Sequence, residues 1–231
     1  VALAIPADGE KFRYGNGFPF QAGPNTAGVF VNLRFEGFPV GDFEAGMDVV
    51  LFDDLENISS NQAVQITRSE QCTHPKTGKP RIIVKHSQKG GFVPFGAKRA
   101  DGSSHPAAGT GFLLGEALNF PRYGDGYYQK EDKTKDMIRC TELNQLAYDG
   151  ETFRLVEQEI FPAEDPLRPP NSEWKIFSGA LRNAIPDGDD LLFGVEATKS
   201  DIAPCWPRET TCGLARWQYR EGRWRPVSYI P

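Results

Sequence analysis

Three observations on the sequence predict an all-β protein. The 231 residues include 24 glycines and 18 prolines, well above average usage, so turns should be frequent. Short runs rich in β-branched and aromatic residues follow one another, with turn residues between them. No window of about 12 residues carries the apolar period of an amphipathic helix. We expect a small β-propeller or a propeller-like assembly of repeated hairpins, with a β-sandwich as the alternative.

The predicted strands follow an irregular N-terminal arm, residues 1–26, in which Gly and Pro recur at short intervals. The remaining residues, 27–231, are expected to form one all-β domain. Turn signals such as residues 77–80 (TGKP), 149–150 (DG) and 221–222 (EG) separate neighbouring strands. In chain order, strands are predicted over Gly28–Phe35, Asp48–Phe52, Ala63–Arg68, Arg81–His86, Gly111–Leu118, Leu143–Tyr148, Thr152–Glu157, Trp174–Leu181, Asp190–Ala197, Leu214–Tyr219 and Arg223–Val227.

Two of the predicted hairpins echo each other. Residues 143–156 and 214–227 share a pattern of Leu, Leu or Trp, Tyr, a turn, Phe or Trp, Arg and Val. Cys140 and Cys212 precede the two copies, and Cys72 precedes an earlier hairpin. A spacing of about 70 residues favours a repeated β module.

Charge and cysteine content bear on partners and compartment. The chain carries 26 Lys and Arg against 31 Asp and Glu, and this net charge of −5 disfavours nucleic acid as a partner. No apolar run approaches the roughly 18 residues of a membrane span. Four cysteines fit two disulfides, for instance Cys72–Cys140 with Cys205–Cys212, which predicts a secreted or periplasmic protein; four reduced thiols are the alternative.

Two histidines are candidates for proton transfer. His86 ends a predicted strand, and His105 lies in residues 101–112, a loop of small residues that runs into the next strand. Small residues let a ligand approach the backbone closely, and binding residues concentrate on loops at strand ends. We expect the two histidines either to meet at one rim as an acid–base pair, or His105 simply to order the turn before Pro106.

Tyrosines and arginines near these histidines suit an acidic sugar. Residues 122–128 (RYGDGYY) combine aromatic rings, which stack on pyranoses, with arginine, whose planar fork matches a carboxylate. A base, an acid and a neutralising arginine are the groups needed to remove a proton beside a uronate carboxylate. The alternative is that the aromatic loop merely packs on the body. The predicted catalytic residues are His86, His105, Tyr127 and Tyr128, and the predicted substrate-binding residues are Arg99, Arg122, Tyr123 and Arg139.

No cofactor is expected, because none of the common nucleotide-binding or zinc motifs occurs. Residues 187–190 (DGDD) could hold a structural calcium ion, although the EF-hand pattern is absent. Lys85, Lys89, Lys98 and Arg99 could form a local basic rim that attracts a polyanion. The sequence leaves the oligomeric state open.

Residues 85–112 (KHSQKGGFVPFGAKRADGSSHPAAGTGF) resemble the sialidase-like β-propeller proteins, which include secreted propeller polysaccharide lyases. The resemblance spans about residues 60–160, and residues 148–153 (YDGETF) are a distant version of the family's Ser-x-Asp-x-Gly-x-x-Trp box. It implies a lyase or glycosidase acting on an acidic polysaccharide, with two His, a Tyr and an Arg at the site. The alternative function is a non-catalytic sugar-binding or structural cell-surface β module.

Overall fold

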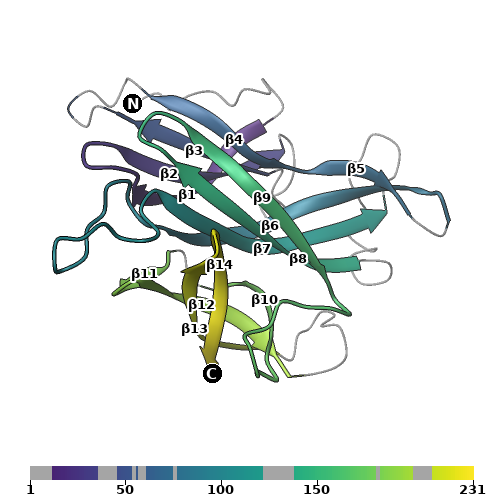
Figure 1. The fold of residues 1–231 in the computed structure, drawn as a ribbon. Helices are drawn as coiled ribbons and strands as arrows, with labels where there is room; N and C mark the ends of the chain where they lie inside the picture. Colours follow the sequence, from purple (N-terminus) through teal and green to yellow (C-terminus); the bar gives the residue numbers. More distant parts are fainter. Residues whose placement is uncertain are drawn as a thin grey trace.

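The computed structural model describes residues 12–35, 46–53, 56, 61–74, 77–121, 138–180, 183–199 and 210–231. These residues form antiparallel β-sheets without a helix, which confirms the all-β prediction (Figure 1). None of the described residues belongs to a helix that is long and apolar enough to cross a membrane.

The strands form three sheets. The first sheet has the order β1-β2-β3-β4, with β1 at Phe12–Gln21, β2 at Ala27–Phe35, β3 at Gly46–Phe52 and β4 at Gln62–Arg68. The central sheet has the order β5-β6-β7-β8-β9, with β5 at Glu70–Thr73, β6 at Pro80–Phe92, β7 at Thr110–Pro121, β8 at Ile138–Tyr148 and β9 at Phe153–Pro162. The third sheet has the order β10-β12-β13-β14, with β11 also paired to β12: β10 at Lys175–Gly179, β11 at Ile185–Asp187, β12 at Asp190–Thr198, β13 at Thr211–Arg220 and β14 at Arg223–Ile230.

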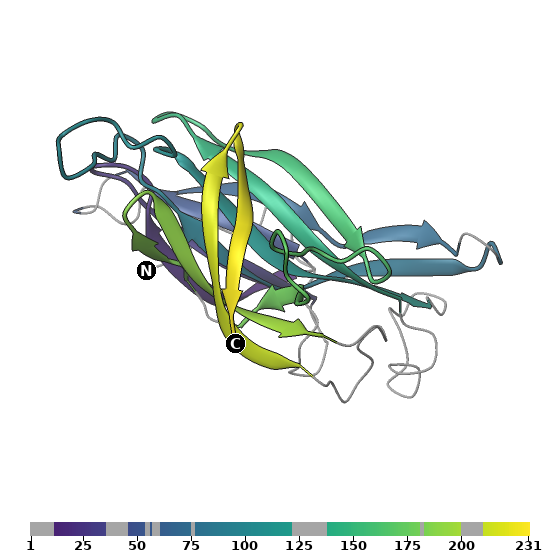
Figure 2. The same cartoon turned by 60° about the horizontal axis from the view of Figure 1, so that its bottom comes forward.

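The sheets stack in layers, and the central sheet lies between the other two (Figure 1 and Figure 2). Successive residues of a strand point to opposite faces, so β7 supplies both sides. Leu113 packs into the core shared with the first sheet, beside Phe30 and Val49. Its neighbours Phe112 and Leu114 pack into the core shared with the third sheet. This double burial explains why β7 is apolar on both faces.

The core between the central and third sheets contains two tryptophans. The rings of Phe112 and Trp217 stack with centroids 4.1 Å apart, and Trp224 adjoins them. Both tryptophans are fully buried. The indole N–H of Trp224 donates to Thr110 Oγ1 at 3.1 Å, which satisfies its polar atom in the core.

All the strands predicted between residues 28 and 227 overlap observed strands. The difference lies in the arm, where residues 12–21 form β1 and pair with β2. The sequence pattern did not indicate this strand, because it contains Gly15, Gly17 and Pro19. Such residues are tolerated because β1 is an edge strand of the first sheet. The pairing register of β1 with β2 shifts between Tyr14 and Gly17. The short strands β5 and β11 were also not expected.

The two echoed segments are both hairpins, β8–β9 and β13–β14, and their aromatic positions correspond. Tyr148 pairs with Phe153 across the first turn, and Tyr219 pairs with Trp224 across the second. The hairpins belong to different sheets that lie on one another. The observed arrangement is a set of antiparallel sheets stacked in layers, and a propeller is not confirmed.

Candidate functional site

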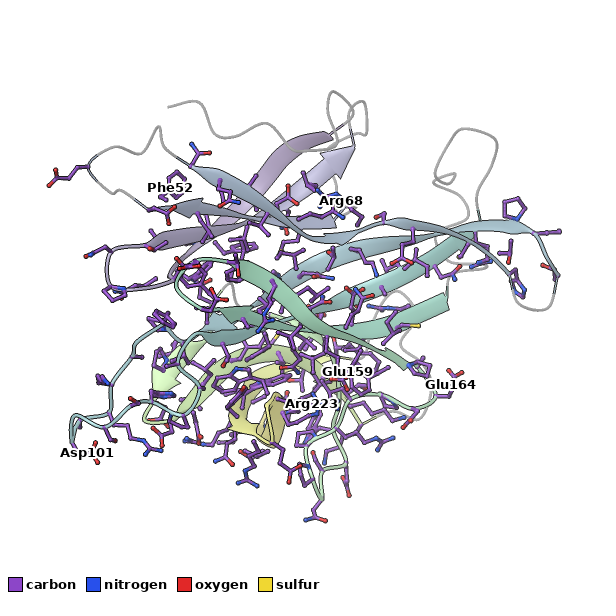
Figure 3. All side chains as sticks on the ribbon, turned by 45° about the horizontal axis from the view of Figure 1, so that its top comes forward. Phe52, Arg68, Asp101, Glu159, Glu164 and Arg223 are labelled. Carbon is purple, nitrogen blue, oxygen red and sulfur yellow. The ribbon has the colours of Figure 1, made fainter. Side chains whose placement is uncertain are left out.

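The loop from Val93 to Gly109 joins β6 to β7 and carries His105. It projects beyond the sheets, with Asp101 at its far end (Figure 3). Its base is closed by backbone hydrogen bonds, in which Val93 N–H donates to Thr110 O at 2.8 Å and Gly109 N–H donates to Val93 O at 3.0 Å. Gly109 has a φ of +76°, a conformation that favours glycine. The two ends of the loop are therefore held together by backbone hydrogen bonds.

His105 faces the turn between β11 and β12, where Arg99 and Asp189 also meet; we call these three residues the His105 clamp. Arg99 binds Asp189 through two hydrogen bonds, Nε to Oδ1 at 2.9 Å and Nη2 to Oδ2 at 2.5 Å. His105 Nε2 lies 3.4 Å from the carbonyl oxygen of Gly188 and 3.6 Å from Asp189 Oδ1. Its Nδ1 accepts the N–H of Ala107 at 3.1 Å.

The electrostatics of the His105 clamp favour a fixed contact. The hydrogen bond from Arg99 lowers the pKa of the Asp189 carboxyl, and Asp189 raises the pKa of Arg99 in return. Because Nδ1 of His105 accepts a hydrogen bond, the neutral ring carries its proton on Nε2, toward the Gly188 carbonyl. Neither ring nitrogen then offers a free lone pair, so the clamp ties the loop to the third sheet.

The other predicted catalytic histidine lies elsewhere along the sheet. His86 is within β6 and pairs with Glu116 of β7, whereas the loop with His105 begins beyond the pair formed by Phe92 and Gly111. These two pairs are five positions apart along β7. At roughly 3.3 Å per residue, the His86 backbone lies about 17 Å from the start of the loop. The strand register does not bring the two histidines to a shared rim.

Arg139, predicted to bind substrate, is buried on β8, where it forms an ion pair with Glu116 of β7. The side chain of Arg139 is only 5 % exposed, and that of Glu116 is 2 % exposed. Arg99 belongs to the His105 clamp. The remaining predicted site residues, Arg122, Tyr123, Tyr127 and Tyr128, lie outside the described residues.

A second group of polar side chains, which the sequence analysis missed, lies inside the central sheet; we call it the Glu142 cluster. Lys85 Nζ binds Glu142 Oε2 at 2.6 Å, and both residues are buried. Lys85 was expected on an exposed basic rim, and its burial corrects that expectation. The other oxygen, Glu142 Oε1, accepts hydrogen bonds from Gln88 at 2.9 Å, Asn144 at 2.8 Å and Gln158 at 3.0 Å.

A sequence signal for the Glu142 cluster does exist. Glu142 and Asn144 alternate with apolar Leu143, so they share the face opposite to Leu143 on a strand that is buried on both sides. Polar residues on a strand that is buried on both faces need partners inside the protein. Only the pairing of β6, β8 and β9 shows which partners these are.

The cysteines do not form the expected long-range disulfide. Cys72 lies on β5 and Cys140 on β8, with two strands between them, and both are free. Three strand spacings of about 4.8 Å place them roughly 14 Å apart across the sheet. A disulfide requires Cα atoms within about 7 Å, so the Cys72–Cys140 prediction is wrong for this structure. Cys212 is also free and exposed, and Cys205 lies outside the described residues.

The carboxylates of the acidic turn at residues 187–190 form ion pairs with arginines. Arg216 binds Asp187 at 2.7 Å and Asp190 at 3.0 Å. Asp189 is held by Arg99 in the His105 clamp. Among the described residues, no group of three or more His, Cys, Asp or Glu side chains is placed to hold a metal ion. A calcium ion at this turn stays a prediction.

One partly exposed aromatic pair packs against the core between the central and third sheets. Trp174, just before β10, and Tyr229, on β14, have ring centroids 5.0 Å apart and planes at 53°. Lys199 Nζ lies 5.1 Å from the centre of the Trp174 ring and 3.1 Å from the carboxylate of Glu173. We call Trp174 and Tyr229 the aromatic platform. Its charged neighbours Lys199 and Glu173 are 55 % and 79 % exposed.

No protein-family model matches the sequence, and no curated protein matches it.

Proposed function

We propose that this protein is a non-catalytic β module that binds a glycan through the aromatic platform. The observation that carries the proposal is the pair of rings, Trp174 and Tyr229, which packs against the core and has exposed charged side chains beside it. Rings held in this way lose little conformational entropy when they bind a sugar. Indole and phenol side chains also combine an apolar face with a polar atom.

The charged neighbours complete such a site. Lys199 and Glu173 provide a donor and an acceptor for sugar hydroxyls, and both are exposed enough to turn toward a ligand. The lysine ammonium also adds attraction for an acidic sugar. The site proposed here thus takes pyranose rings of a polysaccharide, with a preference for chains that carry carboxylates.

The placement of the predicted catalytic residues supports binding over turnover. A lyase needs a base with an available lone pair close to the sugar. His105 uses both ring nitrogens in the His105 clamp, and Arg139 is engaged with Glu116 in the interior. Recognition of a glycan without bond cleavage requires none of these groups.

The test measures binding to a panel of neutral and uronate-containing polysaccharides by affinity electrophoresis and tryptophan fluorescence. Replacing the indole in Trp174→Ala should weaken binding by at least about tenfold, the equivalent of 1.4 kcal/mol of lost contact. Phe95→Ala is the matched control, because Phe95 is a 40 % exposed aromatic residue in the β6–β7 loop, away from the aromatic platform.

Binding that survives Trp174→Ala unchanged would overturn this assignment of the site. Ultraviolet absorbance measures the formation of unsaturated uronate during the same incubations. An increase would show an active lyase and would contradict the non-catalytic role. The secreted or periplasmic location remains a prediction.

A further inference from the structure

The Glu142 cluster contains an amine and a carboxyl group in an arrangement suited to a chemical reaction between them. Lys85 is 1 % exposed and Glu142 is fully buried, and Lys85 Nζ lies 2.6 Å from Glu142 Oε2. Lys85 also reaches a second carboxylate, because its Nζ lies 3.6 Å from Oε1 of Glu70, a residue that is 58 % exposed. We propose that Lys85 Nζ and Glu142 Cδ condense to an intramolecular amide bond that cross-links β6 to β8.

The two groups are already at reacting distance. A nitrogen 2.6 Å from one carboxyl oxygen lies within about 4 Å of the carboxyl carbon, close to the roughly 3–3.5 Å of a near-attack arrangement. Rotation of the Glu142 carboxyl about its last torsion, which is a broad one, turns its face toward the nitrogen. Groups held together in this way react as if at effective concentrations of about 10⁵–10⁸ M.

The strand between β6 and β8 leaves room for the link. In the register of the central sheet, Ala117 of β7 is opposite Lys85, and Gly115 is opposite Glu142. Residues that are paired across strands share a face, so the two positions beneath the Lys85 side chain carry no more than a methyl group. The lysine can therefore lie across β7 to reach β8.

Three carboxamide groups are placed to stabilise the reaction intermediate. Gln88, Asn144 and Gln158 each donate an N–H to Glu142 Oε1, at 2.9, 2.8 and 3.0 Å. When the amine adds to Cδ, negative charge develops on one oxygen of the tetrahedral intermediate. Preorganised donors at such distances stabilise a developing oxyanion, most strongly where water is excluded. Gln88 and Asn144 are themselves almost fully buried.

Glu70 supplies the proton transfers, and the step balances. The Lys85 ammonium gives one proton to Glu70, and the free amine attacks Cδ of Glu142. Glu142 Oε2 then receives that proton from Glu70 and a second one from the attacking nitrogen, and leaves as water. One ammonium and one carboxylate become one neutral amide and one water molecule, with no oxidant or other reactant.

The interior favours this product. Holding an ammonium and a carboxylate away from water carries a desolvation cost that a neutral amide avoids. The water formed leaves a site that is shielded from solvent, because Lys85 and Glu142 are at most 1 % exposed. The bond would also fix two strands of the sheet that packs against both cores.

The first test is the intact mass of the purified, folded protein, followed by sequencing of its proteolytic peptides. The expected mass is one water molecule below the mass calculated from the sequence, with a branched peptide that joins the segment around Lys85 to the segment around Glu142. A protein of full mass, or a loss of water that maps to other residues, would overturn the proposal. The control Lys85→Arg should have the full mass, whereas Lys89→Arg should still lose water.

The second test follows the rate of bond formation. Chain recovered in the unfolded state, before the bond has formed, is refolded, and its mass is measured over time. Glu70→Gln, at an exposed position that should not affect folding, is expected to slow the loss of water by about 10²–10⁴-fold, the usual contribution of a general acid–base group. A loss of water at the same rate in wild type and Glu70→Gln would remove Glu70 from the reaction.

Discussion

At the scale of the residue, the largest contributions to stability come from single side chains that fill the aromatic core. Trp217 is fully buried, stacks on Phe112 and lies near Phe193. No smaller side chain could fill this space between the central and third sheets. The exposed residues of β9, by contrast, remove little apolar surface from water.

We predict that Trp217→Ala lowers the free energy of unfolding by about 3–5 kcal/mol, the usual cost of removing a large aromatic side chain from a packed core. Chemical denaturation followed by circular dichroism measures the change. The control Val156→Ala, at a position that is 55 % exposed, should shift the free energy of unfolding by no more than about 0.5 kcal/mol. Equal effects of the two substitutions would contradict the packing described here.

Thiol reactivity is a second property set residue by residue. Burial raises the pKa of the Cys140 thiol, while Cys212 is exposed on β13. Because the thiolate is the reactive form, we predict that a thiol reagent labels Cys212 in the folded protein and labels Cys140 only slowly until the chain unfolds. Peptide mapping after timed alkylation measures both rates. A Cys212 that reacts only after reduction would instead show a disulfide.

At the scale of the element, hairpins are the units that the sequence specifies most directly, and ion pairs then join them. The β8–β9 hairpin lies over the β13–β14 hairpin, where Glu157 binds Arg223 at 2.9 Å and Glu159 binds Arg225 at 2.7 Å. Figure 3 shows Glu159 and Arg223 in this contact region. Partly exposed ion pairs of this kind contribute little to the free energy of unfolding. Their main effect is on the relative orientation of the two hairpins.

The turn of the β8–β9 hairpin should depend on pH through Asp149. Its carboxylate accepts the N–H of Glu151 at 3.0 Å and the N–H of Thr152 at 2.8 Å, and the Thr152 hydrogen bond is the main cause of its lowered pKa. The folded pKa thus lies below the unfolded value of about 3.9. The carboxylate stabilises the fold above that value, and the contribution is lost as the pH falls through the folded pKa.

We therefore predict that Asp149→Ala lowers the melting temperature at pH 7 and that the difference from wild type narrows as the solution is acidified below about pH 3.9. Thermal unfolding across this pH range makes the comparison. Glu151→Ala, an exposed residue in the same turn, is the control and should leave the melting temperature nearly unchanged. A difference that persists unchanged in acid would contradict the role of the Asp149 carboxylate.

At the scale of the whole molecule, the central sheet links the two cores into one folding unit. Its strand β7 contributes Leu113 to one core and Phe112 to the other. Because β7 is packed on both faces, local unfolding of either outer sheet exposes apolar surface of the central sheet to water.

We predict one cooperative unfolding transition for the whole protein. Leu51→Ala, in the core shared with the first sheet, should lower the free energy of unfolding by about 2–5 kcal/mol. It should shift the transition seen by tryptophan fluorescence by the same amount as the transition seen by circular dichroism, although the buried Trp217 and Trp224 lie in the other core. Two separate transitions would show that the layers unfold independently.

Much of the candidate site could not be predicted from the sequence, and particular residues show why. His105 was correctly placed on a loop of small residues, but its partner Asp189 lies 84 positions away and is reached only through the packing of the third sheet. Lys85 and Arg139 carry charges that are typical of a surface, and both are buried. Their burial follows from partners on neighbouring strands, which local sequence patterns do not specify.

The sequence by itself determined the all-β class, the hairpins and most of the strands, because alternation of apolar residues and the chemistry of turns act over a few neighbouring residues. Tertiary structure alone decided how the strands divide into three sheets, that β1 pairs with β2 at an edge, and which polar groups meet inside. Those outcomes depend on contacts between distant segments, such as Lys85 of β6 with Glu142 of β8. Because Lys85 and Glu142 are buried, their polar groups need partners within the protein, and this requirement gives the Glu142 cluster its geometry.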